Sequence, residues 1–193
     1  MLCTLEGLDG SGKTTVWRRL REVYPEATFT REPTRSWYGE AVRRSVADPA
    51  ADPLAELFLY CADHADHVAN VVSPALERDE LVVSDRYVDS RLAYQGVTLD
   101  GRLDDPVGYV RAIHEPVTVV PDLTCYLRVD VDTALDRSDR DTKFERRDFL
   151  ERVDAVYRSL IEAEPGRFRV VDATRDFEAV VADVTAAIEA ALA

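Results

Sequence analysis

The chain has 193 residues, 46% of them hydrophobic, which is enough for one domain with a sizeable core. Its 37 acidic and 24 basic residues give a formal net charge of −13, which argues against binding to duplex nucleic acid or to an anionic membrane. No apolar run approaches the ~18 residues of a transmembrane helix and the first residues do not resemble a signal peptide, so the expected location is the cytoplasm.

Short β-like runs alternate with amphipathic helical stretches along the whole chain. The expected strands are residues 1–6, 28–31, 81–84, 123–129 and 167–171. The clearest expected helices are residues 14–24, 53–78 and 177–192. This alternation predicts a single α/β domain over residues 1–193, with a doubly wound, five-stranded parallel sheet flanked by helices. Ligands bind such sheets outside the carboxyl ends of the strands.

Directly after the first strand, residues 7–14 match the phosphate-binding loop G-x-x-x-x-G-K-[ST] without a mismatch. The loop consists of Gly7, Leu8, Asp9, Gly10, Ser11, Gly12, Lys13 and Thr14. Such glycines let backbone N–H groups face phosphate oxygens at the start of a helix. We expect Lys13 to reach the β- and γ-phosphates of ATP and Thr14 to hold Mg²⁺. The alternative is a glycine-rich turn that matches by chance, but the strand–loop–helix context favours a P-loop NTPase type of fold.

Two further residues follow the expected strand at 81–84. Asp85 stands where a Walker-B carboxylate would hold the metal directly or through water. Arg86 follows it, and its guanidinium fork would suit a second phosphate. The plainer alternatives are a strand-end turn residue and a surface arginine.

A dense run of charges over about residues 137–147 predicts a short lid that brings cations onto the transferring phosphoryl group. Its cations are Arg137, Arg140, Lys143, Arg146 and Arg147. A solvated helix with i,i+4 ion pairs explains at least half of these residues equally well. Lys143 favours the lid, because the chain has 22 arginines and only one other lysine, Lys13. This scarcity of lysine with many carboxylates indicates either the high-salt cytoplasm of a halophilic organism or a high-GC codon bias.

The cysteines and histidines show no convincing metal-binding pattern. Cys3, Cys61 and Cys125 lie apart in apolar stretches, which is typical of reduced core thiols. His64 and His67 are three residues apart on one expected helix, where a metal pair is conceivable but a surface or core pair is the more common arrangement.

Several segments, in order and over nearly the whole chain, resemble the thymidylate kinase family. They are residues 7–15 with DGSGKTT, 30–33 (TREP), 56–63 (ELFLYCAD), 67–68 (HV), 85–96 (DRYVDSRLAYQG), 121–124 (PDLT) and 144–145 (FE). The resemblance implies transfer of the γ-phosphoryl group of ATP to dTMP, giving dTDP and ADP, with Mg²⁺ as the metal. It also implies a homodimer formed through helices such as residues 53–78.

The resemblance assigns roles residue by residue. Arg31 and Arg86 would grip the acceptor phosphate, Tyr60 would stack on thymine and Tyr94 would pack against the deoxyribose. The full catalytic set is Asp9, Lys13, Arg86, Arg137, Arg140 and Lys143. The ATP-binding set is Gly7, Leu8, Asp9, Gly10, Ser11, Gly12, Lys13, Thr14, Thr15, Ala173 and Thr174, and the metal set is Asp9, Thr14 and Asp85. The acceptor-binding set is Arg31, Tyr60, His64, Arg86, Ser90, Arg91, Tyr94 and Gln95.

Two departures from the family concern the acceptor. His64 stands where many relatives carry an arginine that contacts a thymine carbonyl, and Arg91 is a possible substitute. The usual TREPGG reads TREPTR here. Two other functions remain open at this point. One is another kinase of the same fold, either a deoxynucleoside kinase with Glu32 as its base or a different nucleoside monophosphate kinase, and the other is a nucleotide-dependent switch that hydrolyses ATP slowly.

Overall fold

The computed structural model describes residues 1–137 and 146–193. These residues contain a five-stranded, all-parallel sheet with the strand order β2-β3-β1-β4-β5. The strands are β1 (Leu2–Glu6), β2 (Thr28–Arg31), β3 (Val82–Asp85), β4 (Leu123–Arg128) and β5 (Phe168–Asp172). Each lies within one residue of its expected range, so the predicted α/β class and parallel sheet are confirmed.

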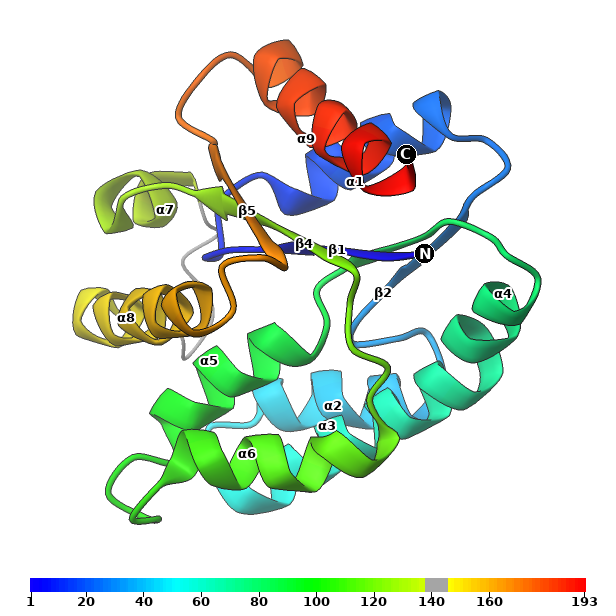
Figure 1. Cartoon of the computed structure of the whole chain (residues 1–193). Helices are drawn as coiled ribbons and strands as arrows, with labels where there is room; N and C mark the ends of the chain where they lie inside the picture. Colours follow the sequence, from blue (N-terminus) through cyan, green and yellow to red (C-terminus); the bar gives the residue numbers. More distant parts are fainter. Residues whose placement is uncertain (138–145) are drawn as a thin grey trace.

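Helices cover both faces of the sheet (Figure 1). They are α1 (Lys13–Val23), α2 (Trp37–Ala47), α3 (Pro53–His67), α4 (Ser73–Glu77), α5 (Val88–Thr98), α6 (Pro106–His114), α7 (Val131–Arg137), α8 (Arg147–Ala163) and α9 (Phe177–Leu192). Helices α1 and α9 pack together on one face, and α5 and α8 lie on the other. Helices α2, α3 and α6 form a further layer beyond α5.

The long helix expected over residues 53–78 is present in three parts. Asp52 caps its start by accepting hydrogen bonds from the backbone N–H groups of Leu54 and Ala55, and Pro53 occupies the first turn. Helix α3 continues through a π-helical turn, η1 (Val68–Val72), into α4. A short 3₁₀ turn, η2 (Glu115–Val117), likewise follows α6.

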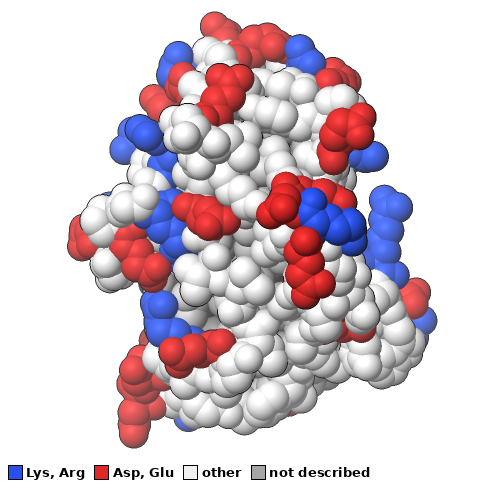
Figure 2. Space-filling view, turned by 45° about the vertical axis from the view of Figure 1, so that its right-hand side comes forward, with Lys and Arg blue, Asp and Glu red and all other residues white. Residues whose placement is uncertain are grey.

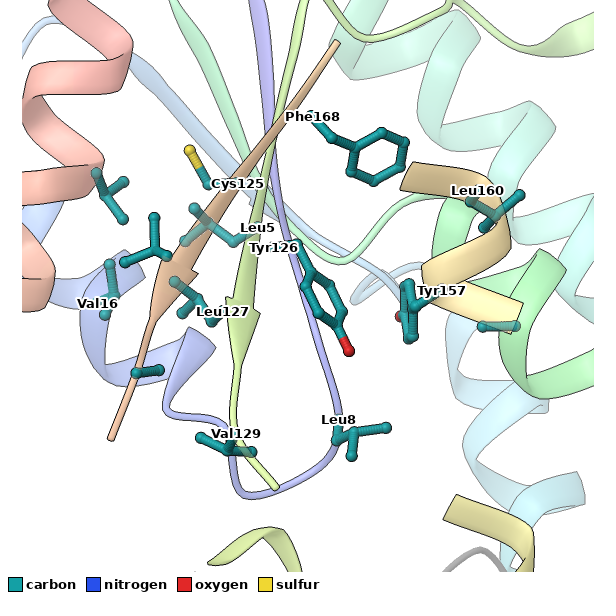
Figure 3. Close-up of a cluster of buried hydrophobic side chains, with 14 of the residues drawn as sticks. Leu5, Leu8, Val16, Cys125, Tyr126, Leu127, Val129, Tyr157, Leu160 and Phe168 are labelled. Carbon is teal, nitrogen blue, oxygen red and sulfur yellow. The ribbon is translucent and has the colours of Figure 1, made fainter. Parts of the chain in front are cut away.

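The core lies between the sheet and the two helical layers (Figure 3). Alternate side chains of β4 face opposite layers, as the period of a strand requires. Leu127 lies on the side of α1 with Val16, whereas Tyr126 points toward α8, where its ring centroid is 4.9 Å from that of Tyr157. All four side chains are at most 2% exposed. The sheet is therefore packed between two apolar layers. The polar side chains of the candidate site lie at the carboxyl ends of its strands.

On the face that Figure 2 shows, acidic side chains are widely spread, with basic side chains beside several of them. The cysteines are free, with Cys3 and Cys125 buried and Cys61 half-buried, as predicted. Within the described parts of the chain, no helix is both long and apolar enough to cross a membrane.

Candidate active site

The P-loop turns sharply between the end of β1 and the start of α1. Gly7 has φ 144°, and a Cβ atom there would lie 2.6 Å from the carbonyl oxygen of Leu127 on β4. Gly12 has φ 90° and opens α1 from the left-handed region, which a residue with a side chain rarely adopts. The sequence therefore needs glycine at these positions to place backbone N–H groups at the start of a helix.

Lys13 lies across this loop, with its side chain almost completely buried. Its Nζ donates hydrogen bonds to the carbonyl oxygens of Gly7 (3.0 Å) and Leu8 (2.7 Å) and to the hydroxyl of Ser11 (3.2 Å). Burial and the neighbouring charge of Arg86 lower the pKa of this amine to about 8. The ammonium group is thus held at the point where the loop would receive phosphate oxygens.

Thr14 and Asp85 meet at the carboxyl edge of the sheet. Because β1 and β3 pair with Leu5 opposite Asp85, the end of β3 lies beside the loop. The hydroxyl of Thr14 donates a 2.7 Å hydrogen bond to Oδ2 of Asp85, and Arg31 on β2 lies 3.9 Å from the same oxygen. A hydroxyl and a carboxylate at this distance form an oxygen donor set that fits Mg²⁺.

Arg86 joins the P-loop to the acceptor side of the site. It adopts φ 71°, which turns its side chain back along the edge, where it forms an ion pair with Asp9 and donates a 3.0 Å hydrogen bond to the hydroxyl of Ser90. Its guanidinium lies 5.3 Å from the centre of the Tyr94 ring, and the hydroxyl of Tyr94 accepts from the backbone N–H of Asp9 (3.0 Å). Burial alone would raise the pKa of the Asp9 carboxyl, but the charges of Arg86 and Lys13 lower it below its usual value.

Glu6, the last residue of β1, is a buried residue of this site that sequence reasoning missed. Its carboxylate accepts hydrogen bonds from the backbone N–H groups of Tyr87 and Ser90, from the Ser90 hydroxyl (2.5 Å) and from the Tyr157 hydroxyl (2.8 Å). Burial and the charge of Asp89 raise the pKa of Glu6 to about 7. The available signal was a carboxylate at the end of an otherwise apolar strand, directly before the loop.

Tyr60, Arg91 and Gln95 form a buried polar cluster on the acceptor side. The guanidinium of Arg91 lies 4.1 Å from the centre of the Tyr60 ring, and Gln95 follows Arg91 one helical turn later on α5. Among the described residues, Nε and Nη2 of Arg91 and both polar atoms of the Gln95 side chain have no hydrogen-bond partner, and Nη2 makes only a longer, 3.5 Å ion-pair contact with Oε2 of Glu32. Buried polar groups are nearly always paired, so these atoms are suited to a polar ligand.

His64 is fully buried, and both ring nitrogens are engaged inside the protein. Nδ1 contacts Oε1 of Glu32 at 2.8 Å, and Nε2 contacts the hydroxyl of Thr118 at 2.9 Å. His67 contacts the same oxygen of Glu32 at 2.7 Å. The two histidines therefore form a buried pair around one carboxylate. The ring nitrogens of His64, which we expected to contact the acceptor, contact Glu32 and Thr118 instead.

The remaining predicted residues lie around the ATP side. Arg137, at the end of α7, donates a 3.1 Å hydrogen bond to the carbonyl oxygen of Ala173, which brings the start of the predicted lid to the loop after β5. Thr174 donates to Asp172 within that loop, and Thr15 is exposed on the first turn of α1. Arg140 and Lys143 lie outside the described residues.

The glycine loop, its buried lysine and the threonine–carboxylate pair beside it define a nucleotide-binding protein of the P-loop class. The sequence model of the family "Thymidylate kinase" matches residues 5–184. The chain belongs to the thymidylate kinase family, as the resemblance of its motifs predicted.

Relatives of high identity cover the chain almost from end to end. A protein of Natronomonas pharaonis described as "Probable thymidylate kinase" is 56% identical over 100% of this chain and 99% of its own length. A protein of Halorubrum lacusprofundi with the same description is 56% identical over 95% of each chain. One from Methanococcoides burtonii is 46% identical over 97% of this chain and 95% of its own.

Proposed function

We propose that the chain transfers the γ-phosphoryl group of ATP to dTMP, giving dTDP and ADP, with Mg²⁺ as the cofactor. The observation that carries the proposal is the buried cluster of Tyr60, Arg91 and Gln95, which α5 connects to the P-loop through the contact of Tyr94 with Asp9. It supplies unpaired hydrogen-bonding groups and an aromatic face beside a phosphate-binding loop, which is what a nucleotide acceptor requires.

The chemistry needs alignment and charge neutralisation more than a base. The acceptor phosphate is already anionic at neutral pH, so one of its oxygens attacks the γ-phosphorus as the bond to the β-phosphate oxygen breaks and ADP leaves. Lys13 neutralises the γ-phosphoryl group, and Arg86 with Arg31 holds the acceptor phosphate in line. Thr14 and Asp85 would hold Mg²⁺, which would supply positive charge against the phosphates of ATP. Asp9 keeps Arg86 directed at the acceptor through their ion pair.

The base and sugar are selected by the side chains of the acceptor cluster. Thymine presents a carbonyl oxygen at position 4 beside an N–H at position 3. Nε and Nη2 of Arg91 are donors that suit the carbonyl, and the Gln95 amide can both donate and accept. Tyr60 supplies the stacking face. The ring of Tyr94 packs where a ribose 2′-hydroxyl would otherwise lie.

Three wider features belong to the same proposal. Arg137 contributes a lid cation on the ATP side, and Arg140 and Lys143 are the other proposed lid cations. The enzyme is a homodimer in the cytoplasm, and the exposed Trp37 on α2 and Phe58 on α3 suit a subunit contact. The enzyme is active in concentrated salt. The net charge of −13 and the presence of only two lysines in the sequence favour this setting.

The contacts of Glu32 count against the deoxynucleoside kinase alternative. Glu32 is only 1% exposed and is engaged by His64 and His67, whereas a base for a 5′-hydroxyl must reach the substrate. Burial would raise the pKa of Glu32, but the nearby His64 and its hydrogen bonds lower it well below its usual value. A carboxyl of low pKa is also a weak base.

A label on the γ-phosphate of ATP separates the three functions. With dTMP present, we expect one labelled dTDP for each ADP formed. Label in inorganic phosphate, regardless of acceptor, would identify an ATPase or switch. Label in dTMP made from thymidine, with no dTDP from dTMP, would identify a deoxynucleoside kinase. Either result would overturn the proposal.

A further inference from the structure

One carboxylate, that of Glu32, connects three segments behind the acceptor cluster. Its Oε1 lies 2.8 Å from Nδ1 of His64 and 2.7 Å from Nδ1 of His67, and both histidines belong to α3. Its Oε2 lies 3.5 Å from Nη2 of Arg91 on α5. All four side chains are at most 4% exposed, so water does not screen these contacts.

The hydrogen bonds around His64 show which atoms carry protons. The hydroxyl of Thr118 donates its single hydrogen to the backbone carbonyl of His114 at 2.8 Å. It must therefore accept from Nε2 of His64, which lies 2.9 Å away. Because Nδ1 of His64 contacts Glu32, the ring is held at both nitrogens, between the carboxylate and Thr118.

His67 contacts the same oxygen of Glu32 from the next turn of α3. The hydroxyl of Thr30 lies 2.6 Å from Nε2 of His67 and can donate to it, which leaves the proton of the ring on Nδ1 facing Glu32. Oε1 of Glu32 is then contacted by two ring nitrogens. Only Oε2 remains to act on Arg91.

We infer that Glu32 is the positioning residue for Arg91, and that His64 controls which base the enzyme accepts by fixing Glu32 rather than by touching the nucleotide. The inference rests on the proposed function, because it takes Arg91 as the group that contacts the base. The 3.5 Å ion-pair contact draws one end of the guanidinium toward Oε2, and the ring of Tyr60 supports its face. Orientation of Arg91 is thereby set from inside the protein.

The consequence is discrimination between thymine and cytosine. A fixed pair of N–H donors suits the carbonyl oxygen at position 4 of thymine or uracil and is mismatched with the amino group at that position of cytosine. A site built to hydrogen-bond one group rejects the analogue that lacks it, by far more than an apolar pocket rejects a missing methyl group. The ratio of kcat/KM for dTMP to kcat/KM for dCMP therefore reports the orientation of Arg91.

Glu32→Gln is the first test, with the full-length protein. The amide oxygen can still accept from both histidines, but an NH₂ group replaces the oxygen that faces Arg91. We expect the dTMP/dCMP ratio to fall by about tenfold or more, equivalent to ~1.4 kcal/mol, while the KM for ATP stays within about twofold. A purely structural role would lower kcat for both acceptors and leave the ratio unchanged. That unchanged ratio would overturn the inference.

Two substitutions of His64 form a matched pair that keeps the test valid if Glu32→Gln fails to fold. The amide nitrogen of asparagine lies near the place of Nδ1 and retains the donor to Glu32, whereas that of glutamine lies near Nε2 and retains the contact to Thr118. We expect His64→Asn to keep the dTMP/dCMP ratio within about threefold and His64→Gln to lower it as Glu32→Gln does. Equal ratios in the two variants would contradict the inference.

A double variant tests whether Glu32 acts through Arg91. Arg91→Leu should lower the ratio alone, and adding Glu32→Gln to it should lower the ratio no further, because the two residues act as a unit. Additive losses would mean that Glu32 acts independently and would overturn the inference. If wild-type protein forms no dTDP from dTMP, the proposed function fails. If it does form dTDP and these variants keep the wild-type dTMP/dCMP ratio, only the proposed role of Glu32 is contradicted.

Discussion

Arg86, the residue directly after β3, forms an ion pair with Asp9 in the middle of the P-loop. The two residues are far apart in the sequence, yet the parallel pairing of β1 with β3 brings them to the same edge of the sheet. The pair links the loop that binds ATP to the side chain that we assign to the acceptor phosphate. On that assignment, this ion pair would set the spacing between the two substrates.

Arg86→Lys should lower kcat by about 100-fold or more although the charge is retained. The guanidinium contacts Asp9 and Ser90 at once, and an ammonium group cannot reproduce this fork. Steady-state kinetics with ATP and dTMP varied separately would measure the loss, which should spare the KM for ATP. Near-wild-type turnover in Arg86→Lys would show that only the charge matters.

Lys13→Ala should abolish measurable turnover while the protein stays folded. The amine lies across the loop within hydrogen-bond distance of three of its groups, and no other described side chain occupies that place. The loss of one such cation costs about 10²–10³-fold in kcat or more. Circular dichroism and thermal unfolding would establish that the fold remains, with Arg18→Ala on the exposed face of α1 as the control. Substantial activity in Lys13→Ala would exclude the P-loop from the mechanism.

Glu6 predicts a particular dependence of stability on pH. Its pKa is about 7 in the folded protein because burial disfavours the charged form, and ~4.3 in an unfolded chain. The folded state therefore binds the extra proton between these values, so the contribution of Glu6 is fully present below pH ~4.3 and is lost as the pH rises through 7.

The comparison that isolates this effect is with Glu6→Gln, whose side chain does not titrate. Chemical unfolding of both proteins between pH 5 and 8 should show wild type losing stability relative to the variant as the pH rises. Parallel curves for the two proteins would mean that Glu6 has an ordinary pKa.

Tyr94→Phe should lower stability by about 1 kcal/mol and reduce turnover, yet keep the preference for deoxyribonucleotides. The variant removes the hydroxyl that accepts from the backbone N–H of Asp9, and a lost hydrogen bond of this kind costs on that order. The ring, which we assign to the sugar, remains. Assays with dUMP and UMP would measure the preference, and its loss in Tyr94→Phe would assign the selection to the hydroxyl instead.

The residues of the P-loop could be predicted from sequence because their chemistry is local. Residues 7–14 fix their own backbone, and Asp85 with Arg86 follows a recognisable buried strand, so their meeting at one edge followed from the rule for parallel sheets. Helix α5 could not be recognised by periodicity, because nine of its eleven residues are buried and no polar stripe marks a solvent face.

The roles of Glu6 and His64 depend on contacts between distant segments. Glu6 is a strand residue whose hydrogen-bond partners are Tyr87 and residues of α5 and α8, and nothing near it in the chain indicates them. For His64, the family pattern marked the position as acceptor-binding, but the surrounding Glu32 and Thr118 engage its ring. The local sequence shows that position 64 is a histidine, but only the packing of distant segments determines which residues contact its ring.

The measurement that tests the account most directly is kcat/KM for a panel of acceptors, dTMP, dUMP, dCMP, dGMP, UMP and thymidine, with ATP and Mg²⁺ at low and at molar KCl. We predict that dTMP has the highest value and that activity rises with salt, because salt screens the net charge of −13 against anionic substrates. ADP release that is the same with every acceptor, or a higher kcat/KM for dCMP than for dTMP, would contradict the account.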